Sequence, residues 1–239
     1  MQWRQHSPPG NHRDVLGCFN RRLVLRGYLA KGMDWLEGVE KYKSPNHEEI
    51  TTYTPDEITK LLTGADKRLV PFLAIGAFAG LRHWEISRLD WAEVELNDHA
   101  ESFIEVRAAK SKNKVRRLVR VHDNLKAWLL PLREDSGAVS DYANVTKQLL
   151  ARGKSSGVAW KKNALRHSFI SYRVAECADV PRTADEAGNS PAIIKESYLR
   201  RVKPELAKEW FAVMPPPPPK KKEREERLPK NVIKLKVAA

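Results

Sequence analysis

The chain has 239 residues, of which 43 are Lys or Arg and 30 are Asp or Glu, so its formal net charge is +13. This length accommodates one large domain or two small ones, and an apolar content of 41% is enough for a core, which excludes a chain that is disordered throughout. The two cysteines, Cys18 and Cys177, are far apart in the sequence. They exclude a disulfide framework and a structural zinc site, and they predict a reducing compartment.

The apolar runs of this sequence are too short for a membrane or a secretory protein. The longest nearly apolar run, residues 69–81, contains Pro71 and falls short of the roughly 20 residues that span a bilayer. The first residues contain no apolar stretch of the kind found in a signal peptide. We therefore expect a cytoplasmic protein with no membrane partner.

The positive charge predicts a polyanionic partner, and nucleic acid is the commonest polyanion in a cell. Residues 220–239 hold eight basic and three acidic side chains, so five of the thirteen excess charges lie in this tail. The rest of the chain is still basic, which places the expected nucleic-acid contact on the folded part as well.

Near the N-terminus the patterns are weak. The first fifteen or so residues show no period and predict a flexible arm, whereas Val15 to Tyr42 suggests one or two short helices around Gly27 and Gly32. Residues 43–47 have the composition of a linker.

A helix is predicted to begin sharply at Thr54. Thr54 can cap the amide of Glu57, Pro55 suits the first helical position, and Glu57 can reach back to the amide of Thr54. A core helix is expected over residues 67–79, and a shorter one follows Gly80-Leu81-Arg82.

Period-two patterns in residues 103–106 and 115–121 flank a lysine-rich turn and predict a two-stranded hairpin. Helical patterns then recur over residues 124–132, 142–151, 163–176, 182–187, 191–200 and 204–211. The predicted fold class is mainly α with a small antiparallel β-sheet, an α+β fold. Pro215 to Pro219 form a stiff spacer, and the basic tail beyond it has a disordered composition.

Five scattered motifs follow one another along this predicted domain. They are Gly80-Leu81-Arg82 with Glu85, the hairpin tip with Lys110, the segment from Asn163 to Arg166, Gly188-Asn189, and Tyr198 nine residues after Asn189. In their order and spacing, from about Tyr53 to Pro215, these motifs resemble the catalytic domain of tyrosine recombinases, the phage-integrase family.

The resemblance implies a role for each position. Tyr198 corresponds to the nucleophile, Arg82 and Arg166 to the two catalytic arginines, and Glu85 to the acidic residue that orients the site. Lys110 corresponds to the hairpin lysine that acts as general acid, with Lys112 as the alternative. Basic residues near the site are expected to contact double-stranded DNA, namely Lys112, Lys114, Arg116 and His167.

The implied chemistry needs these residue types. Attack on a phosphodiester builds negative charge on the non-bridging oxygens, which two guanidinium groups can hold. In the family the tyrosine forms a 3′-phosphotyrosyl link and releases a 5′-hydroxyl, so strands are rejoined without ATP or metal. The resemblance therefore implies no cofactor and no metal, and a homo-tetramer that acts in DNA integration and recombination.

Two positions depart from the family pattern. Asn163 stands where the family has histidine, and Asn189 stands where it has histidine or tryptophan. Asparagine donates hydrogen bonds but exchanges no proton near pH 7. The alternative function is therefore a decayed recombinase that binds DNA without cleaving it, and a third is a basic interaction protein that binds through its tail.

The same resemblance implies the domain organisation. Residues 1–46 correspond to an N-terminal arm and the remnant of a helical core-binding domain, residues 49–214 to the catalytic domain, and residues 215–239 to the tail. A recombinase with this short N-terminal part lacks most of the second jaw that clamps DNA.

Overall fold

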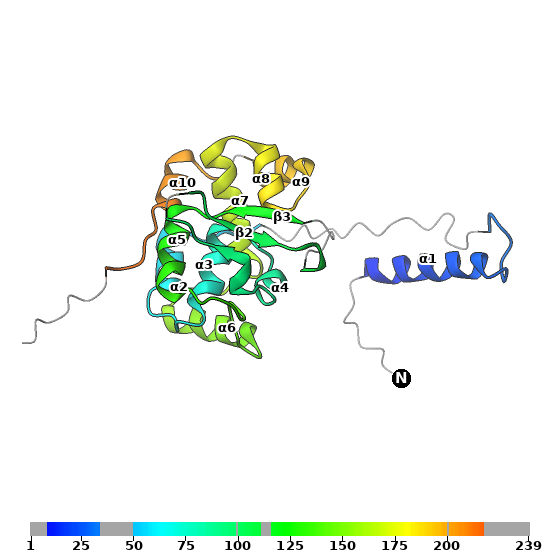
Figure 1. The fold of residues 1–239 in the computed structure, drawn as a ribbon. Coiled ribbons are helices and arrows are strands. Elements are labelled where there is room, and N and C mark those ends of the chain that lie inside the picture. Colours follow the sequence, from blue (N-terminus) through cyan, green and yellow to red (C-terminus); the bar gives the residue numbers. More distant parts are fainter. Residues whose placement is uncertain (1–8, 34–49, 99, 111–115, 200, 218–239) are drawn as a thin grey trace, which may run out of the picture. The chain divides into compact units, whose positions relative to one another are not determined.

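A computed structural model describes residues 9–33, 50–98, 100–110, 116–199 and 201–217 (Figure 1). The chain divides into two units, Met1–Glu49 and Ile50–Ala239. The predicted linker at residues 43–47, most of the hairpin tip and the tail beyond residue 217 lie outside the described residues.

The first unit contains one described helix, α1 (Pro9–Leu25). The expectation of a flexible arm over the first fifteen residues is wrong from Pro9 onward. Proline is compatible with the first turn of a helix, and the residues up to Asp14 offer no apolar stripe that a periodicity argument could detect. In place of the one or two short helices expected around Gly27 and Gly32, the described residues form one longer helix that ends before Gly27, whose φ is +76°.

The second unit is built around two helices with almost wholly buried faces, α3 (Val70–Phe78) and α7 (Ala164–Cys177). Every residue of α3 is buried, because α2 (Pro55–Leu62), α5 (Asp123–Leu129) and α7 all pack on it. The capping box predicted at Thr54 is confirmed, with the Glu57 amide 3.1 Å from Thr54 Oγ1 and the Thr54 amide 2.9 Å from Glu57 Oε2.

The small sheet has three antiparallel strands in the order β1 (Val94–Glu95), β2 (Phe103–Val106) and β3 (Arg117–Arg120). Ile104 is paired with Val94 on one side and Val119 on the other. The predicted hairpin is thus extended by a third strand, which was missed because two residues are too few to show alternation. The fold class, mainly α with a small antiparallel sheet, is confirmed.

The remaining elements surround this core. They are α4 (His83–Ile86), α6 (Val145–Ser156), α8 (Val180–Ala187), α9 (Pro191–Ser197), α10 (Pro204–Phe211) and the one-turn helices η1 (Trp91–Glu93), η2 (Ala108–Lys110) and η3 (Leu130–Leu132). Figure 1 shows α6 at the end of this unit opposite α8 and α9. Because α8 packs on β3, α7 and α9, its C-terminus lies where segments distant in the sequence meet.

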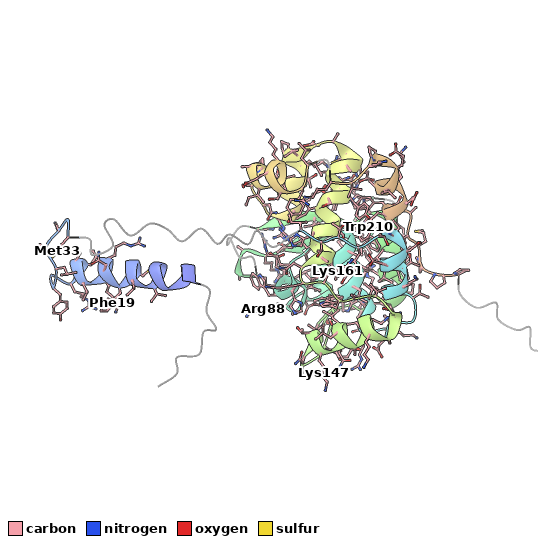
Figure 2. The ribbon with its side chains drawn as sticks, turned by 180° about the vertical axis from the view of Figure 1, so that it is seen from behind. Phe19, Met33, Arg88, Lys147, Lys161 and Trp210 are labelled. Atoms are coloured by element: carbon pink, nitrogen blue, oxygen red, sulfur yellow. The ribbon has the colours of Figure 1, made fainter. Side chains whose placement is uncertain are left out.

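Trp210 fixes α10 to the core (Figure 2). Its indole is fully buried, stacks on Tyr172 with ring centroids 4.3 Å apart, and donates a hydrogen bond to the Ala77 carbonyl at 3.2 Å. Burial of a large aromatic with its polar atom satisfied is strongly stabilising, so α10 belongs to the folded unit.

Candidate active site

The C-terminus of α8 collects the guanidinium groups of three arginines. Its successive carbonyl oxygens accept hydrogen bonds in sequence order, Glu186 from Arg117 at 3.2 Å, Ala187 from Arg166 at 2.5 Å and Gly188 from Arg82 at 2.7 Å. The last carbonyls of a helix have no partner within the helix and carry the negative end of its dipole. Three cations from three other elements are therefore held at one helix end.

Gly188 makes this arrangement possible. Its φ of +65° ends α8 in the left-handed region, and a Cβ there would lie 3.2 Å from Cζ of Arg117. Glycine adopts this conformation without strain and leaves room for the guanidinium.

Arg82 is positioned by the start of α4. It is the residue before the helix, and its backbone amide donates to Glu85 Oε2 at 2.8 Å. Gly80, with a φ of +64°, lets the chain leave α3 against α7, because a Cβ there would lie 2.2 Å from the Phe169 ring.

Glu85 is buried and joins two of the arginines. Its carboxylate accepts from Arg82 Nη1 at 3.1 Å and from both terminal nitrogens of Arg117, at 3.1 and 2.7 Å. Burial opposes the charge on Glu85, but the hydrogen bonds and charge of Arg117, together with those of Arg82, outweigh it and lower the pKa of Glu85. The carboxylate is therefore ionised near neutral pH.

Asn189 lies between the guanidinium groups of Arg82 and Arg166. Its Oδ1 accepts from Arg166 Nη2 at 2.9 Å and from Arg82 Nη2 at 3.3 Å. A neutral acceptor between two cations holds them together without neutralising either charge.

Arg166, in the first turn of α7, also donates to the Gly80 carbonyl at 2.6 Å. Burial, followed by repulsion from Arg82, lowers the pKa of Arg166 to about 9, so it remains cationic near neutral pH. Three arginines against the one carboxylate of Glu85 leave the cluster with a net positive charge. It can attract an anion with fork-shaped donors, as a phosphate requires.

Tyr198 lies at the C-terminal end of α9 with only 5% of its surface exposed. It packs in a small apolar cluster with Phe169 and Ile194, and its hydroxyl lies 2.7 Å from Nδ1 of His167. Burial raises the pKa of Tyr198, while the charges of Arg166, Arg201 and Arg82 act in the opposite direction. A phenol next to an imidazole and within the field of two arginines can become a nucleophile.

The same fold occurs in known recombinases. XerA recombinase aligns with a TM-score of 0.51 and 21% sequence identity over 72% of this chain. The integrase from mycobacterium phage Brujita aligns with a TM-score of 0.52 and 15% identity over 87% of this chain. XerH site-specific recombinase, in a pre-cleavage complex with its difH substrate, aligns with a TM-score of 0.50 and 18% identity over 80% of this chain. The chain has the tyrosine recombinase fold. It spans 65% of XerA, 63% of XerH and 74% of the Brujita integrase.

Sequence comparison alone finds no such relative. No protein-family model matches this chain, and no curated protein matches its sequence. The likeness to the recombinases is therefore one of backbone fold.

Within the recombinase fold, Asn163 precedes α7 in a left-handed conformation, with a φ of 57° and a ψ of 1°. Its side chain makes no capping hydrogen bond and is exposed. Left-handed conformations cost energy for residues other than glycine, although asparagine tolerates them best. Asn163 therefore precedes Arg166 by three residues, with an exposed side chain that has no capping role.

Lys110 is not among the contacts of the arginine cluster. Its ammonium lies 2.7 and 2.9 Å from the two carboxylate oxygens of Glu93, which is buried and also receives Arg107 at 3.1 Å. An ion pair of this kind fixes the base of the hairpin turn. A lysine in this position must leave Glu93 to donate a proton elsewhere.

The other predicted DNA contacts fall into three groups. Lys112 and Lys114 lie outside the described residues. Arg116 is exposed and pairs with Glu105 at 2.6 Å. His167 contacts Tyr198, which sequence reasoning did not predict.

Sequence reasoning also missed Arg117. Along β3 this residue shares a face with buried Val119, because side chains alternate along a strand. A charged residue on the inward face of a strand requires a buried partner, and that signal could have identified it.

Among the described residues, no group of three or more His, Cys, Asp or Glu side chains could hold a metal ion. In that same part of the chain, no helix combines the length and apolar character needed to cross a bilayer.

Proposed function

We propose that this protein is a DNA strand-exchange enzyme that cleaves and rejoins DNA through Tyr198. The observation that carries the proposal is that Arg82 and Arg166 meet at Asn189, while the Tyr198 hydroxyl lies on His167 and within the field of both guanidinium charges. The recombinase fold supports it, and the basic charge of the chain fits a DNA partner.

The arginines bind the scissile phosphate. Arg82 and Arg166 share Asn189 Oδ1. Arg82 also bonds to the Gly188 carbonyl and the Glu85 carboxylate, and Arg166 to the carbonyls of Ala187 and Gly80, so both guanidinium planes are fixed before DNA arrives. Donors that are already oriented stabilise the pentavalent transition state without a cost of reorganisation. Asn163 and the free amide hydrogens of Asn189 are available for further hydrogen bonds to phosphate.

Bond formation and bond breaking balance as follows. The phenol oxygen of Tyr198 attacks phosphorus and its proton passes to His167, while the bond from phosphorus to the 5′-oxygen breaks. The products are a 3′-phosphotyrosyl link and a 5′-hydroxyl. Attack by the 5′-hydroxyl of another strand reverses these steps and restores the phosphodiester.

The leaving 5′-oxygen needs a proton, and a lysine of the hairpin provides it. Lys110 is our first assignment and Lys112 the second. The ion pair with Glu93 holds Lys110 until the phosphates of bound DNA, which carry one negative charge each along the strand, compete for the ammonium.

Two features of the site favour a second function. Asn163 and Asn189 cannot exchange protons, and Tyr198 is buried in the free protein, so a form that holds DNA without cutting it is the alternative. Both functions share the phosphate site and differ only in the covalent step.

The test is covalent capture on DNA. A nicked suicide substrate, drawn from sequences that flank the gene, traps the phosphotyrosyl product, which is seen as a slower band on a denaturing gel. We expect a band with the natural chain and with Tyr142→Phe, a matched change at a tyrosine bonded to Asp66 away from the site. Tyr198→Phe should abolish it. A band that persists in Tyr198→Phe would refute the nucleophile, and salt-sensitive binding with no band in any variant would establish the second function.

Two further features are part of the proposal. Residues 1–46 represent the remnant of a core-binding domain, residues 49–214 the catalytic domain and residues 215–239 a basic tail. Strand exchange requires two DNA sites, so the active species on DNA is a homo-tetramer.

A further inference from the structure

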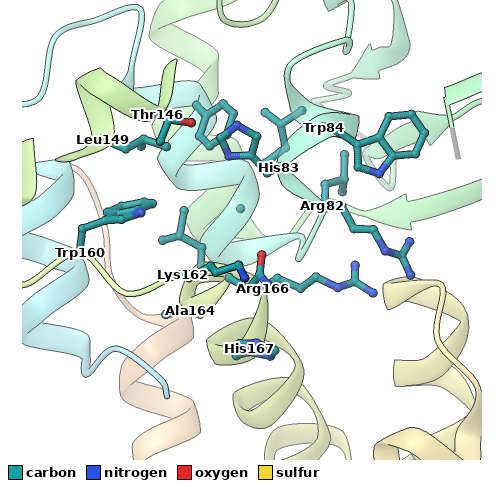
Figure 3. Close-up of a pocket in the computed structure, with 16 residues that line it drawn as sticks. Arg82, His83, Trp84, Thr146, Leu149, Trp160, Lys162, Ala164, Arg166 and His167 are labelled. Carbon is teal, nitrogen blue, oxygen red and sulfur yellow. The ribbon is translucent and has the colours of Figure 1, made fainter. Parts of the chain in front are cut away.

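A cavity of about 680 Å³ opens beside the arginine cluster (Figure 3). Its walls come from α3, α4, α6, α7 and the segment before α7. This volume falls within the range of about 300 to 1,000 Å³ that is typical of small-ligand sites. The proposed phosphate chemistry uses only one end of it.

One wall of the cavity is apolar and aromatic. Trp160 and Leu149 lie on the side away from the arginines in Figure 3, and His83 stands near them. The His83 ring is held edge-on against Phe72, with centroids 5.0 Å apart. Flat rings beside aliphatic side chains offer the surface on which a nucleobase stacks.

The other end is polar and positively charged. Arg82 and Arg166 line the same cavity, and Asn163 adds an exposed amide that can both donate and accept. An anion site and an aromatic pocket are thus joined in one cavity. This combination matches a phosphate linked to a nucleoside and exceeds what a phosphate alone would use.

We propose that the cavity binds the nucleoside next to the phosphate held by Arg82 and Arg166, with its base against Trp160 and His83. The inference rests on the proposed function for its natural ligand, which is DNA. Such binding takes the base out of the duplex stack, and contact with the aromatic wall offsets the cost of unstacking. It therefore gives the enzyme a preference for sites that unstack easily at the point of cleavage.

The probe is thymidine 3′,5′-bisphosphate, which presents a phosphate on either side of its sugar. Its affinity for the full chain is measured by titration calorimetry against that of the abasic deoxyribose bisphosphate. We expect the nucleotide to bind on the order of tenfold more tightly, because only the nucleotide has a base that can stack on the aromatic wall. Equal affinities would overturn the proposal.

Two neighbouring positions of α6 provide matched variants. Thr146 is exposed and lines the cavity, whereas Lys147, labelled on α6 in Figure 2, is exposed and lies outside the lining. Thr146→Trp should fill the cavity and remove the preference for the nucleotide over the abasic compound, while Lys147→Trp should retain it. Neither substitution removes a core side chain. A preference that survives in Thr146→Trp would place the base elsewhere and overturn the proposal.

The same variants separate this inference from the proposed function. The covalent band depends on Tyr198, so its absence in the natural chain would refute cleavage while leaving the nucleotide preference as a test of the cavity. A covalent band of equal yield at limiting DNA in Thr146→Trp and Lys147→Trp would refute the nucleoside pocket and leave the nucleophile intact.

Discussion

His167 and Tyr198 together determine how the nucleophile loses its proton. Burial raises the pKa of the phenol, so at neutral pH it is protonated and needs an acceptor. The imidazole nitrogen 2.7 Å away is that acceptor in our mechanism. His167 directly follows Arg166, so a single turn of α7 carries both the proposed base and an arginine that would donate hydrogen bonds to the phosphate.

Replacing His167 by Gln should slow covalent cleavage by a factor of roughly 10² to 10⁴ at neutral pH. Because the folded-state pKa of Tyr198 lies above its usual value of 10, its ionised fraction grows only in the alkaline range, so the variant should recover as pH rises. The measurement is the initial rate of covalent product between pH 6 and 10, with DNA affinity as the control. A constant ratio between the two proteins over this range would argue against His167 as the base.

Arg117 and Arg116 are adjacent arginines with opposite surroundings. Arg117 is 10% exposed and makes a two-bond contact with buried Glu85, whereas Arg116 is 67% exposed on Glu105. Arg117→Met should lower the free energy of unfolding by about 2 kcal/mol or more, because it removes a buried charged partner. Arg116→Met should change it by less than about 1 kcal/mol.

Denaturant unfolding measures both variants. We also expect Arg117→Met to reduce covalent yield, since Glu85 then holds Arg82 alone. Equal unfolding free energies for the two variants would contradict a buried role for Arg117.

The candidate site was predictable only where chemistry and order in the sequence coincided. Arg82, Arg166 and Asn189 were selected by resemblance, and the structure brings them into mutual contact. Their catalytic roles stay predictions. The pairing of Lys110 with Glu93 was not predictable, because it joins residues 17 positions apart with two strands, β1 and β2, between them.

At the scale of elements, the C-terminus of α8 organises the site. This eight-residue helix and Gly188, which follows it, supply three carbonyls to three guanidiniums. The helix is also fastened to α7 by Arg173, whose guanidinium holds the Glu186 carboxylate at 2.8 and 2.9 Å. Displacement of this one helix end would therefore disturb the positions of Arg82, Arg117 and Arg166 at once.

Gly188 and Gly157 offer a matched test of this role. Both end a helix in the left-handed region, with φ of +65° and +70°, but only Gly188 has a guanidinium where a Cβ would lie. Alanine at either position should cost about 1–2 kcal/mol of stability from backbone strain. Gly188→Ala should in addition weaken DNA binding, measured by titration of labelled duplex. Equal losses of DNA affinity in both variants would show that α8 does not position the arginines.

The elements themselves were predictable where capping and periodicity agreed. The helix after Thr54 begins as its capping box predicts, and α10 spans the predicted residues Pro204–Phe211. The strand Val94–Glu95 was missed, because its pairing with β2 is set by the tertiary fold and leaves no pattern in two residues.

At the scale of the molecule, His122 makes stability depend on pH. Its ring packs at a tilt against Phe211 with centroids 4.6 Å apart, and its Nε2 has no partner among the described residues. Burial is the main cause that lowers the pKa of His122 from 6.5 to about 4. Nearby arginine charges, that of Arg173 above all, act in the same direction, and the charge of Glu186 opposes them. Between pH 4 and 6.5 the unfolded chain therefore binds more protons than the folded one.

The folded state should lose about 3 kcal/mol from this group as pH falls from 6.5 to 4. His122→Phe keeps a ring against Phe211 and removes the ionisable group, so its stability should fall less steeply over the same interval. Urea unfolding at several pH values compares the two slopes. Parallel curves would show that His122 is not the group responsible.

Charge is distributed over the whole chain, and the tail holds five of the thirteen excess positive charges. Deletion of residues 218–239 should make DNA affinity less steeply dependent on salt, because fewer counterions are released, while binding itself persists. The measurement is the dissociation constant at several salt concentrations. Loss of all binding would favour the third alternative, a protein that interacts only through its tail.

The burial of Tyr198 also lowers its reactivity toward reagents that modify tyrosine in the protein without DNA. With 5% of its surface exposed and its oxygen on an imidazole, this phenol is shielded from nitrating and iodinating reagents, which attack accessible tyrosines such as Tyr28, 78% exposed. A DNA phosphate can reach the phenol oxygen only if α9 or its neighbours yield. Labelling of Tyr198 would then report engagement with a substrate, and the gap between labelling with and without DNA would measure how much the site opens.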